Sequence, residues 1–331
     1  MVWRQGLSPT IRTVSPDWRD TDFDDVDGMT RRSLPLVVTT SIGAPIVKRW
    51  TRRAAMAAGG IVAAASMVVV IGMLRWNCES KRLVTRLMTD AGREPDHAGK
   101  LPRDARRDAL PAPVARYFAF ALPGDRRPIR HARLRFAGTF ASRPNEWTRF
   151  TAEQHVSADP PAFVWDARID MVPLVPVRVR DSYVGGTGAM CARLGTVIPV
   201  VDQHGTPEMA AASLLRFLAE AVWLPTALLP RDGLSWTAID DSSARVTLTD
   251  GPTTVWMDVQ FGSHGEIATV FALRHRDVNG TPVLTPWFAR HSDYAPVDGM
   301  MIPTSGEVAW LPAEGRTPYW RGRVVEATYR R

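Results

Sequence analysis

The sequence is poor in cysteine and lacks the common motifs of metal and nucleotide sites. Two cysteines in 331 residues exclude a disulfide scaffold. We expect Cys78 and Cys191 to be free or loosely paired. No Gly-rich phosphate loop accompanies an alternation of strands and helices, which excludes a Rossmann-type nucleotide domain. The seven histidines form no pair at metal-ligand spacing and no G-x-S-x-G motif occurs, so we expect no metal, no cofactor and no serine-hydrolase site.

The chain has a net charge of +7, but most of its length has no excess of positive over negative charge. The net charge is +3 over residues 1–53, +5 over residues 54–127 and −1 over residues 128–331. A domain that binds nucleic acid is expected to carry a basic face. The large C-terminal region is close to neutral, so we expect no nucleic-acid partner. The basic flanks instead favour contact with anionic lipid headgroups.

Residues 54–74 form a run of 21 residues without any charge. A helix of this length is about 30 Å long, which matches the hydrocarbon core of a bilayer. A buried core helix seldom goes so far without a polar face. We therefore expect a transmembrane helix over residues 54–74, with a cleaved signal peptide as the weaker alternative.

Basic residues are denser before this run than after it, which points the N-terminus into the cytoplasm and residues 75–331 out of it. The expected location is the cell membrane, with a single span and an extracytoplasmic C-terminal domain. Residues 1–53 contain an acidic patch and no sustained periodicity, so we expect a disordered cytoplasmic tail. Translation from Met29, or from nearer the membrane, is an alternative. Residues 75–127 are expected to form a helical juxtamembrane connector, with an apolar stripe at Val84, Leu87 and Met88 and a short helix over residues 113–122.

From residue 128 the sequence alternates apolar and polar residues with a period of two, which predicts antiparallel strands at hairpin spacing. The expected strands are residues 129–140, 147–156, 163–171, 175–184, 190–201, 234–239, 244–249, 254–261, 266–276, 286–294, 306–311 and 321–329.

One helix, over residues 206–229, interrupts these strands. Thr206, Pro207 and Glu208 supply a cap, a first-turn proline and an early acid. The rest of the helix is apolar nearly all round and shorter than a bilayer, which favours burial against a sheet. The expected fold is mainly β (α+β), a large curved antiparallel sheet or half-barrel over residues 128–331. We expect it to wrap this helix and to leave an apolar cavity.

Several segments resemble a bacterial family of membrane-anchored proteins known only as a domain of unknown function. They are LPAPVARYFAFAL (110–122), PPAFVWDARIDM (160–171), PVRVRDSYVGGTGAM (176–190), GTPEMAAASLLRFLAEAVWLPTALLP (205–230), TPW (285–287) and PYWRGR (318–323). The resemblance covers about residues 110–330 and implies no activity. The layout also looks like the lipoprotein-carrier half-barrels, in which a curved sheet and a helix hold acyl chains, although no motif is shared.

Charged residues of both signs gather on the consecutive expected strands over residues 163–171 and 175–184. Their Asp and Arg side chains are placed to pair across a hairpin. One interpretation is a ladder of surface ion pairs. The other is a polar cluster at a pocket mouth, where Arg side chains hold a phosphate or carboxylate. Arg216 and Glu220, four residues apart in the apolar helix, form either an internal salt bridge or part of a site.

The sequence therefore supports three functional hypotheses. The first is a single-pass membrane protein whose extracytoplasmic domain binds an apolar or amphipathic, lipid-like ligand. The second is an extracytoplasmic hydrolase of envelope glycan or lipid, which would use carboxylates beside tryptophans. The third is a scaffold or interaction module without catalysis. The candidate ligand-binding residues are Asp166, Arg168, Arg178, Asp181, Glu208, Arg216, Glu220, Trp223, Trp287 and Trp320.

Overall fold

The computed structural model describes residues 44–92, 110–124, 127–143, 145–172 and 175–331, and side chains except those of residues 44–52 and 172. The chain divides into residues 1–56 and a compact unit of residues 57–331, and every contact discussed below lies within the second unit. Residues 1–43 of the expected tail and residues 93–109 of the expected connector lie outside the described residues.

The N-terminal helix α1 (Ala44–Ala91) is continuous and contains the whole uncharged run. Residues 44–53 are therefore helical, and the connector begins inside the same helix. One stretch, Arg53–Ala91, is long and apolar enough to cross a membrane, and its most apolar window has no residue buried in protein. From Gly72 onward, side chains three or four positions apart face the sheet, and Trp76 and Leu87 are fully buried. The expected stripe packs here, because Leu87, Val84 and Met88 contact apolar residues of the sheet.

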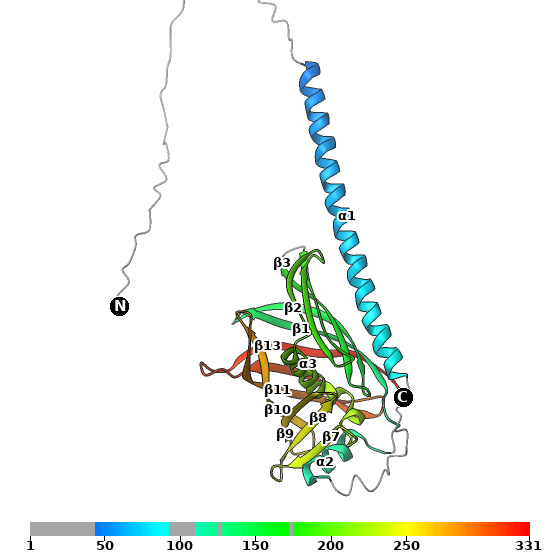
Figure 1. The fold of residues 1–331 in the computed structure, drawn as a ribbon, viewed down its shortest axis with the longest axis vertical. Coiled ribbons are helices and arrows are strands. Elements are labelled where there is room, and N and C mark those ends of the chain that lie inside the picture. Colours follow the sequence, from blue (N-terminus) through cyan, green and yellow to red (C-terminus); the bar gives the residue numbers. More distant parts are fainter. Residues whose placement is uncertain (1–43, 93–109, 125–126, 144, 173–174) are drawn as a thin grey trace, which may run out of the picture. The chain divides into compact units, whose positions relative to one another are not determined.

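Thirteen antiparallel strands form one sheet that curls into a half-barrel (Figure 1). They are β1 (His131–Arg143), β2 (Glu146–Ser157), β3 (Ala162–Val172), β4 (Val175–Val184), β5 (Thr187–Leu194), β6 (Ile198–His204), β7 (Leu234–Ala238), β8 (Ser243–Asp250), β9 (Thr253–Phe261), β10 (Ile267–Val278), β11 (Thr281–Val297), β12 (Met300–Trp310) and β13 (Thr317–Arg330). The prediction of a mainly β half-barrel is confirmed.

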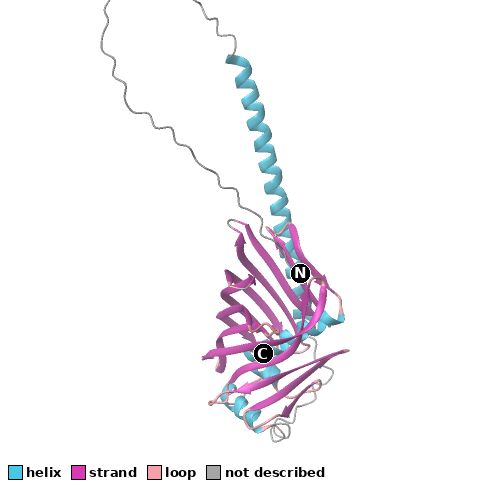
Figure 2. Cartoon of the chain, turned by 90° about the vertical axis from the view of Figure 1, so that its left-hand side faces the viewer, coloured by secondary structure: helices cyan, strands magenta, loops and turns pink. Residues whose placement is uncertain are grey.

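The strand order joins two meanders at the middle of the sheet. The order is β6-β5-β4-β3-β2-β1-β13-β12-β11-β10-β9-β8-β7, so the first and last strands of the chain pair with each other. The chain must therefore travel from one edge of the sheet, β6, to the opposite edge, β7. Figure 2 shows the strands of the curled sheet from the side.

The segment that connects the two edges consists of α3 (Pro207–Glu220) and two short 3-10 turns, Ala221–Trp223 and Pro225–Leu228. The single helix expected over residues 206–229 was therefore too long at its C-terminal end. Thr206 caps α3 as predicted, because its hydroxyl accepts a hydrogen bond from the backbone N–H of Met209 at 3.2 Å. The helix contacts β3, β4 and β5 of one meander and β9 and β10 of the other. It therefore lies against strands from both halves of the sheet.

A row of glycines crosses the middle of the sheet. Gly322 on β13 pairs with Gly138 on β1 and with Gly306 on β12. The indole of Trp320 occupies the space that a side chain at Gly322 would need. Strand glycines permit local bending and close approach, so this row lets the curved sheet carry a large aromatic side chain on a crowded surface.

The expected strand over residues 190–201 was wrong, because the structure has two strands there. β5 and β6 are joined by a turn in which Gly195 and Thr196 have φ of 57° and 67°. A β-branched residue rarely adopts positive φ, so the sequence at Thr196 predicted a continuous strand where the structure has a turn. The hairpin turns at Asn279–Gly280 and Asp298–Gly299 have positive φ at all four residues.

The short helix α2 (Ala112–Ala121) agrees with the expected helix over residues 113–122. Its buried Val114, Tyr117 and Phe118 belong to the main apolar core. The helix packs against β8 and β12, so this part of the connector belongs to the β domain.

Candidate ligand cavity

A cavity of about 1070 Å³ lies between α3 and the sheet. Side chains from α3 and from β1, β3, β4, β5, β6, β10, β11, β12 and β13 line it. Most of these side chains are apolar or aromatic. Ligand pockets commonly have volumes of roughly 300–1,000 Å³, so the cavity has room for a ligand of substantial size.

One face of α3 lines the cavity while the opposite face is packed into the core. Met209, Ala212, Arg216 and Ala219 follow the helical period and reach the cavity. Leu214, Phe217 and Leu218 point the other way and are buried. The sequence of α3 is apolar nearly all round because both of its faces meet apolar surroundings.

The charges of α3 belong to a cluster at the cavity wall. Arg216 donates to Glu220 at 2.8 Å and to Asp181 on β4 at 2.6 Å. Gln154 on β2 donates to the second oxygen of Glu220 at 2.6 Å. The guanidinium also lies 4.9 Å from the ring centroid of Trp165. The internal salt bridge expected for Arg216 and Glu220 is present, with Asp181 as a third charged member that spacing along α3 did not indicate.

Burial acts to lower the pKa of Arg216, but the nearby carboxylates of Glu220 and Asp181 outweigh that effect and raise the pKa above its usual value. Arg216 therefore keeps its positive charge. One oxygen of Asp181 and the amide oxygen of Gln154 are buried without a hydrogen-bond partner. These two acceptors therefore lie within the packed protein behind the cavity surface.

The opposite wall of the cavity is built from arginine and aromatic residues of β10–β13. Arg274 donates to the carbonyl of Ala212 on α3 at 3.1 Å and to the hydroxyl of Tyr319 at 3.3 Å. Trp287 donates to the same hydroxyl at 3.0 Å. The rings of Trp310 and Tyr319 stack with centroids 5.6 Å apart. These contacts join α3 to the second meander and hold the aromatic wall in place.

His291 on β11 is a buried polar group in the cavity lining. Neither of its ring nitrogens has a hydrogen-bond partner, and its ring lies edge-on to Trp223 with centroids 6.3 Å apart. Burial lowers the pKa of His291 to about 4. The imidazole is therefore neutral near pH 7 and contributes a weakly polar site to an apolar wall.

Seven of the ten candidate residues line this cavity. They are Asp181, Glu208, Arg216, Glu220, Trp223, Trp287 and Trp320. Trp223 also donates to the carbonyl of Pro303 at 3.0 Å, and its ring packs against Phe136. The tryptophans thus form part of the wall and are anchored by their own contacts.

Asp166 and Arg178 lie outside the cavity lining, in contact with α1. Asp166 accepts from Arg178 at 2.6 Å, from the indole of Trp76 at 2.9 Å and from Ser80 at 2.7 Å. Arg180 donates to Glu79 at 2.8 Å, and its guanidinium lies 4.6 Å from the Trp76 ring centroid. The Asp–Arg pairing expected across the hairpin is present, and the pairs attach α1 to the sheet.

Arg168 takes no part in either cluster. Its side chain is exposed and pairs with Asp170 on the same strand at 3.1 Å. For this residue the structure agrees with the interpretation of a surface ion pair.

Two further acids, Glu307 and Asp240, are differently placed. Glu307 lines the cavity and is bound by Arg316 and by Arg321, the latter at 2.6 Å. Burial acts to raise the pKa of Glu307, but these two arginines outweigh it and lower the pKa. Asp240 accepts a hydrogen bond from the backbone N–H of Ser242 at 2.8 Å, which is the behaviour of a turn residue.

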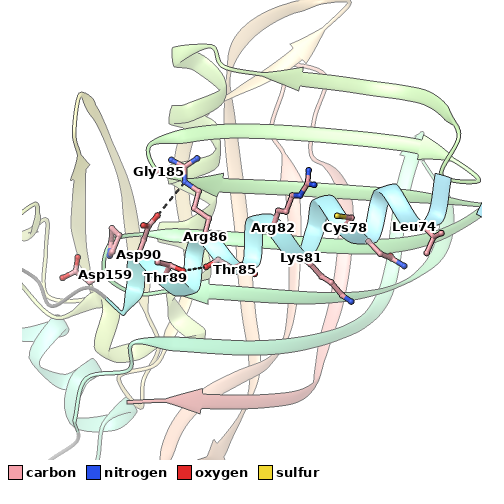
Figure 3. Close-up of a pocket in the computed structure, with 12 residues that line it drawn as sticks. Leu74, Cys78, Lys81, Arg82, Thr85, Arg86, Thr89, Asp90, Asp159 and Gly185 are labelled. Atoms are coloured by element: carbon pink, nitrogen blue, oxygen red, sulfur yellow. Dashed lines mark hydrogen bonds and ion pairs between the residues drawn. The ribbon is translucent and has the colours of Figure 1, made fainter. Parts of the chain in front are cut away.

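A second hollow of about 1170 Å³ runs along the side of α1. Figure 3 shows Arg82 and Arg86 on one side of the helix and Lys81 on the other. Arg86 pairs with Asp90 at 3.9 Å. Because its basic side chains diverge, this hollow lacks a set of groups that converge on one ligand. Both Cys78, in this hollow, and Cys191 are free.

Among residues with described positions, no group of three or more His, Cys, Asp or Glu side chains is placed to hold a metal ion. Several cavity residues were not expected from the sequence, above all Trp165, Arg274 and His291. Their strands read as ordinary alternating segments, and only the curl of the sheet brings them to one cavity.

Comparison with known proteins gives a family and two distant structures. A model described as a family of unknown function (DUF6920) matches residues 108–329, which confirms the expected resemblance to a domain of unknown function. No curated protein matches. A LolA superfamily protein from Nitrosomonas europaea has 12% identity and a TM-score of 0.37, covering 67% of this chain and 95% of its own. A beta-barrel-like protein of domain of unknown function DUF1849 from Brucella abortus has 12% identity and a TM-score of 0.25, covering 62% and 99%. Neither likeness is close enough to indicate a ligand.

Proposed function

We propose a function from the cavity itself, because this chain belongs to the DUF6920 family, a family of unknown function. The protein is a single-pass membrane protein whose extracytoplasmic half-barrel wraps α3 and holds a lipid-like, amphipathic ligand between that helix and the sheet. The observation that carries the proposal is the large apolar cavity with a charged cluster in its wall.

The lining matches the chemistry of an amphipathic ligand. Apolar side chains such as Ile169, Val177 and Met190 provide surface for hydrocarbon, and burial of apolar area is favourable by about 25 cal/mol per Å². The Arg216 cluster provides charged groups for a ligand headgroup, since Asp181, Arg216 and Glu220 all belong to the cavity lining. A ligand with both parts satisfies both surfaces.

The exposed apolar part of α1 supports the membrane part of the proposal. Large apolar side chains before Gly72 are exposed, including Ile61 at 71% and Met67 at 65%. An uncovered helix of this length needs an apolar environment. A bilayer around residues 54–74 supplies it.

The contacts of the cavity acids favour binding over hydrolysis. A glycoside hydrolase needs one carboxyl group kept protonated by apolar surroundings. Glu220 and Glu307 instead pair with arginines, and for Glu307 these arginines lower the pKa. No observation in the described part of the chain favours the scaffold hypothesis over ligand binding.

The test is lipid binding by the full chain in detergent. Lipids that co-purify are identified by mass spectrometry, and affinity is measured with a fatty acid that carries an environment-sensitive fluorophore. Met190→Asp places a charge in the cavity wall, and we expect at least about tenfold weaker binding, or about 1.4 kcal/mol.

The matched control is Met301→Asp, since Met301 on β12 is also half-buried but does not line the cavity. We expect its affinity to stay within twofold of the wild type. Equal losses in the two variants, or a wild-type chain that binds neither the probe nor any lipid, would contradict the proposal.

A further inference from the structure

An apolar group of side chains stands at one end of the half-barrel, where β3 ends, β4 begins and β6 starts. We name Met171, Val175, Ile198 and Val200 the rim. These side chains are 40%, 39%, 58% and 59% exposed. β6 is an edge of the sheet, and its Pro199 and Asp202 disfavour pairing with a further strand. The two large exposed aliphatic side chains on this strand therefore need an apolar cover and not a strand partner.

The rim is continuous across the neighbouring turns. Leu194 at the end of β5 pairs with Ile198 at the start of β6. A side-chain carbon built on Gly195 would lie 3.1 Å from Cγ1 of Val175. The start of β4 and the β5–β6 turn are thus in contact, and the rim is one surface.

The β5–β6 turn also contacts α1. A side-chain carbon built on Gly72 would lie 3.0 Å from the carbonyl oxygen of Thr196 and 3.0 Å from Cγ2 of Val197. Before Gly72, the described side chains of α1 are exposed on every face of the helix. Gly72 is therefore the first point at which the helix meets the sheet.

This contact fixes the position of the rim along the axis of α1. Gly72 lies two residues before Leu74, the last residue of the uncharged run. At a rise of 1.5 Å per residue, the contact lies about 3 Å along the axis from the end of that run. The rim is therefore level with the boundary between hydrocarbon and headgroups when residues 54–74 span a bilayer.

The position of the rim is held by the docking of α1 on β3 and β4. Trp76 and Ser80 bind Asp166 within the first two turns after Gly72, and Leu87 is fully buried two turns later. Because α1 is attached to the sheet at these several points, the rim keeps a fixed position relative to the helix. The rim cannot leave the membrane surface without breaking these contacts.

The cavity reaches the rim, because Met171 and Val200 belong to its lining as well. We propose that the rim is inserted into the interfacial layer of the bilayer that holds α1, and that the cavity opens there, so that a lipid passes between bilayer and cavity without crossing water. This inference rests on the proposed function. The partner is the lipid surface itself, because the rim adjoins the end of an apolar helix that has no protein cover.

Depth-dependent quenching tests the position of the rim. The full chain, with Cys78→Ser and Cys191→Ser, is labelled with a fluorophore at Ile198→Cys and reconstituted in phosphatidylcholine and phosphatidylglycerol vesicles. Some vesicles contain lipids with a quencher on the acyl chain. Ile239→Cys is the matched control, since Ile239 is 51% exposed and follows β7, at the opposite edge of the sheet. Val69→Cys reports on the membrane span.

We expect strong quenching at position 69, clear quenching at position 198 and none above background at position 239. Equal quenching at positions 198 and 239 would overturn the proposal. Disulfide-linked dimers of the unlabelled Ile198→Cys chain, in place of quenching of the labelled one, would also overturn it and would assign the rim to a second copy. Loss of quenching at position 69 would overturn both the membrane anchor and the rim. This measurement needs no ligand in the cavity, so its failure is distinct from a failure of lipid binding.

Transfer kinetics test the opening of the cavity. Ile198 does not line the cavity, so Ile198→Asp is expected to bind the fluorescent fatty acid in detergent within twofold of the wild type. Uptake of the same probe from vesicles is expected to slow at least fivefold, because a charge at the rim opposes insertion. Ile239→Asp is expected to change neither value. Uptake by Ile198→Asp at the wild-type rate would overturn the proposal.

Discussion

The two faces of the β3–β4 hairpin use the same residue types for different purposes. Arg180 and Asp181 are neighbours on β4, yet Arg180 binds α1 and Asp181 binds Arg216 at the cavity. Successive side chains of a strand point to opposite faces. One short charged segment thus attaches the membrane helix on one side and places a carboxylate in the cavity on the other.

These two clusters differ in composition and in burial. The cluster at α1 joins two arginines to two carboxylates, from Asp166 and Glu79, and the Glu79 side chain is 40% exposed. The cavity cluster has a single arginine for two carboxylates, and none of its three side chains is more than 18% exposed. Buried charges depend strongly on their partners. The comparison therefore predicts that the cavity cluster is the more sensitive of the two to substitution.

The largest effect is expected from Arg216→Met. Asp181 and Glu220 would then remain partly buried without a cation, and the free energy of unfolding is expected to fall by about 3 kcal/mol. Urea unfolding of the full chain in detergent measures this value. The triple variant Arg216→Met, Asp181→Asn, Glu220→Gln should recover most of the loss. A loss below about 1 kcal/mol in the single variant would break the comparison.

Lowering the pH is expected to destabilise the fold at the cavity through protonation of His291. The unfolded chain binds a proton at this residue below about pH 6.5, whereas the folded chain excludes it until about pH 4. The contribution of His291 to stability is therefore complete above pH 6.5 and declines as the pH falls toward 4. Between pH 7 and pH 5, His291→Leu should lose about 2 kcal/mol less than the wild type in urea unfolding. Parallel pH profiles for the two proteins would contradict this assignment.

A smaller effect is expected at α1 from Asp166→Asn. The variant keeps an acceptor for Trp76 and Ser80 but loses the charge that pairs with half-exposed Arg178, so we expect a loss of about 1 kcal/mol. Hydrogen exchange over residues 80–91 should accelerate, because the docked part of α1 opens more often. Asp170→Asn, at an exposed pair, is the control and should change neither value. Unchanged exchange in Asp166→Asn would show that the apolar contacts of Leu87 alone hold the helix.

Much of the fold was predictable from local patterns. The N-terminal boundary of α3 was correct because capping by Thr206 and the first-turn proline act within a few residues. β4 was predicted with both ends correct because the Gly185–Gly186 turn follows it directly. The β5–β6 hairpin was missed because its turn uses Thr196, whose positive φ has no signature in the sequence.

The site was predictable only in part, for a similar reason. The buried charges of α3 were recognised because a charge in an apolar helix needs a partner. The partner Asp181 lies 35 residues away along the chain from Arg216, and Asp166, an equally plausible acid from its sequence pattern, lies against α1. Strand alternation separates inward from outward residues but does not say which face meets which helix.

The sequence alone determined the local properties of this protein. These are the uncharged run, the strands with most of their turns, and the capped apolar helix, since each depends on residues close together in the chain. The tertiary structure decided which residues share a cavity, because that depends on the pairing of β1 with β13 and on the path of α3 between the two edges. It also decided that α1 meets the sheet at Gly72, since this contact joins segments more than 100 residues apart.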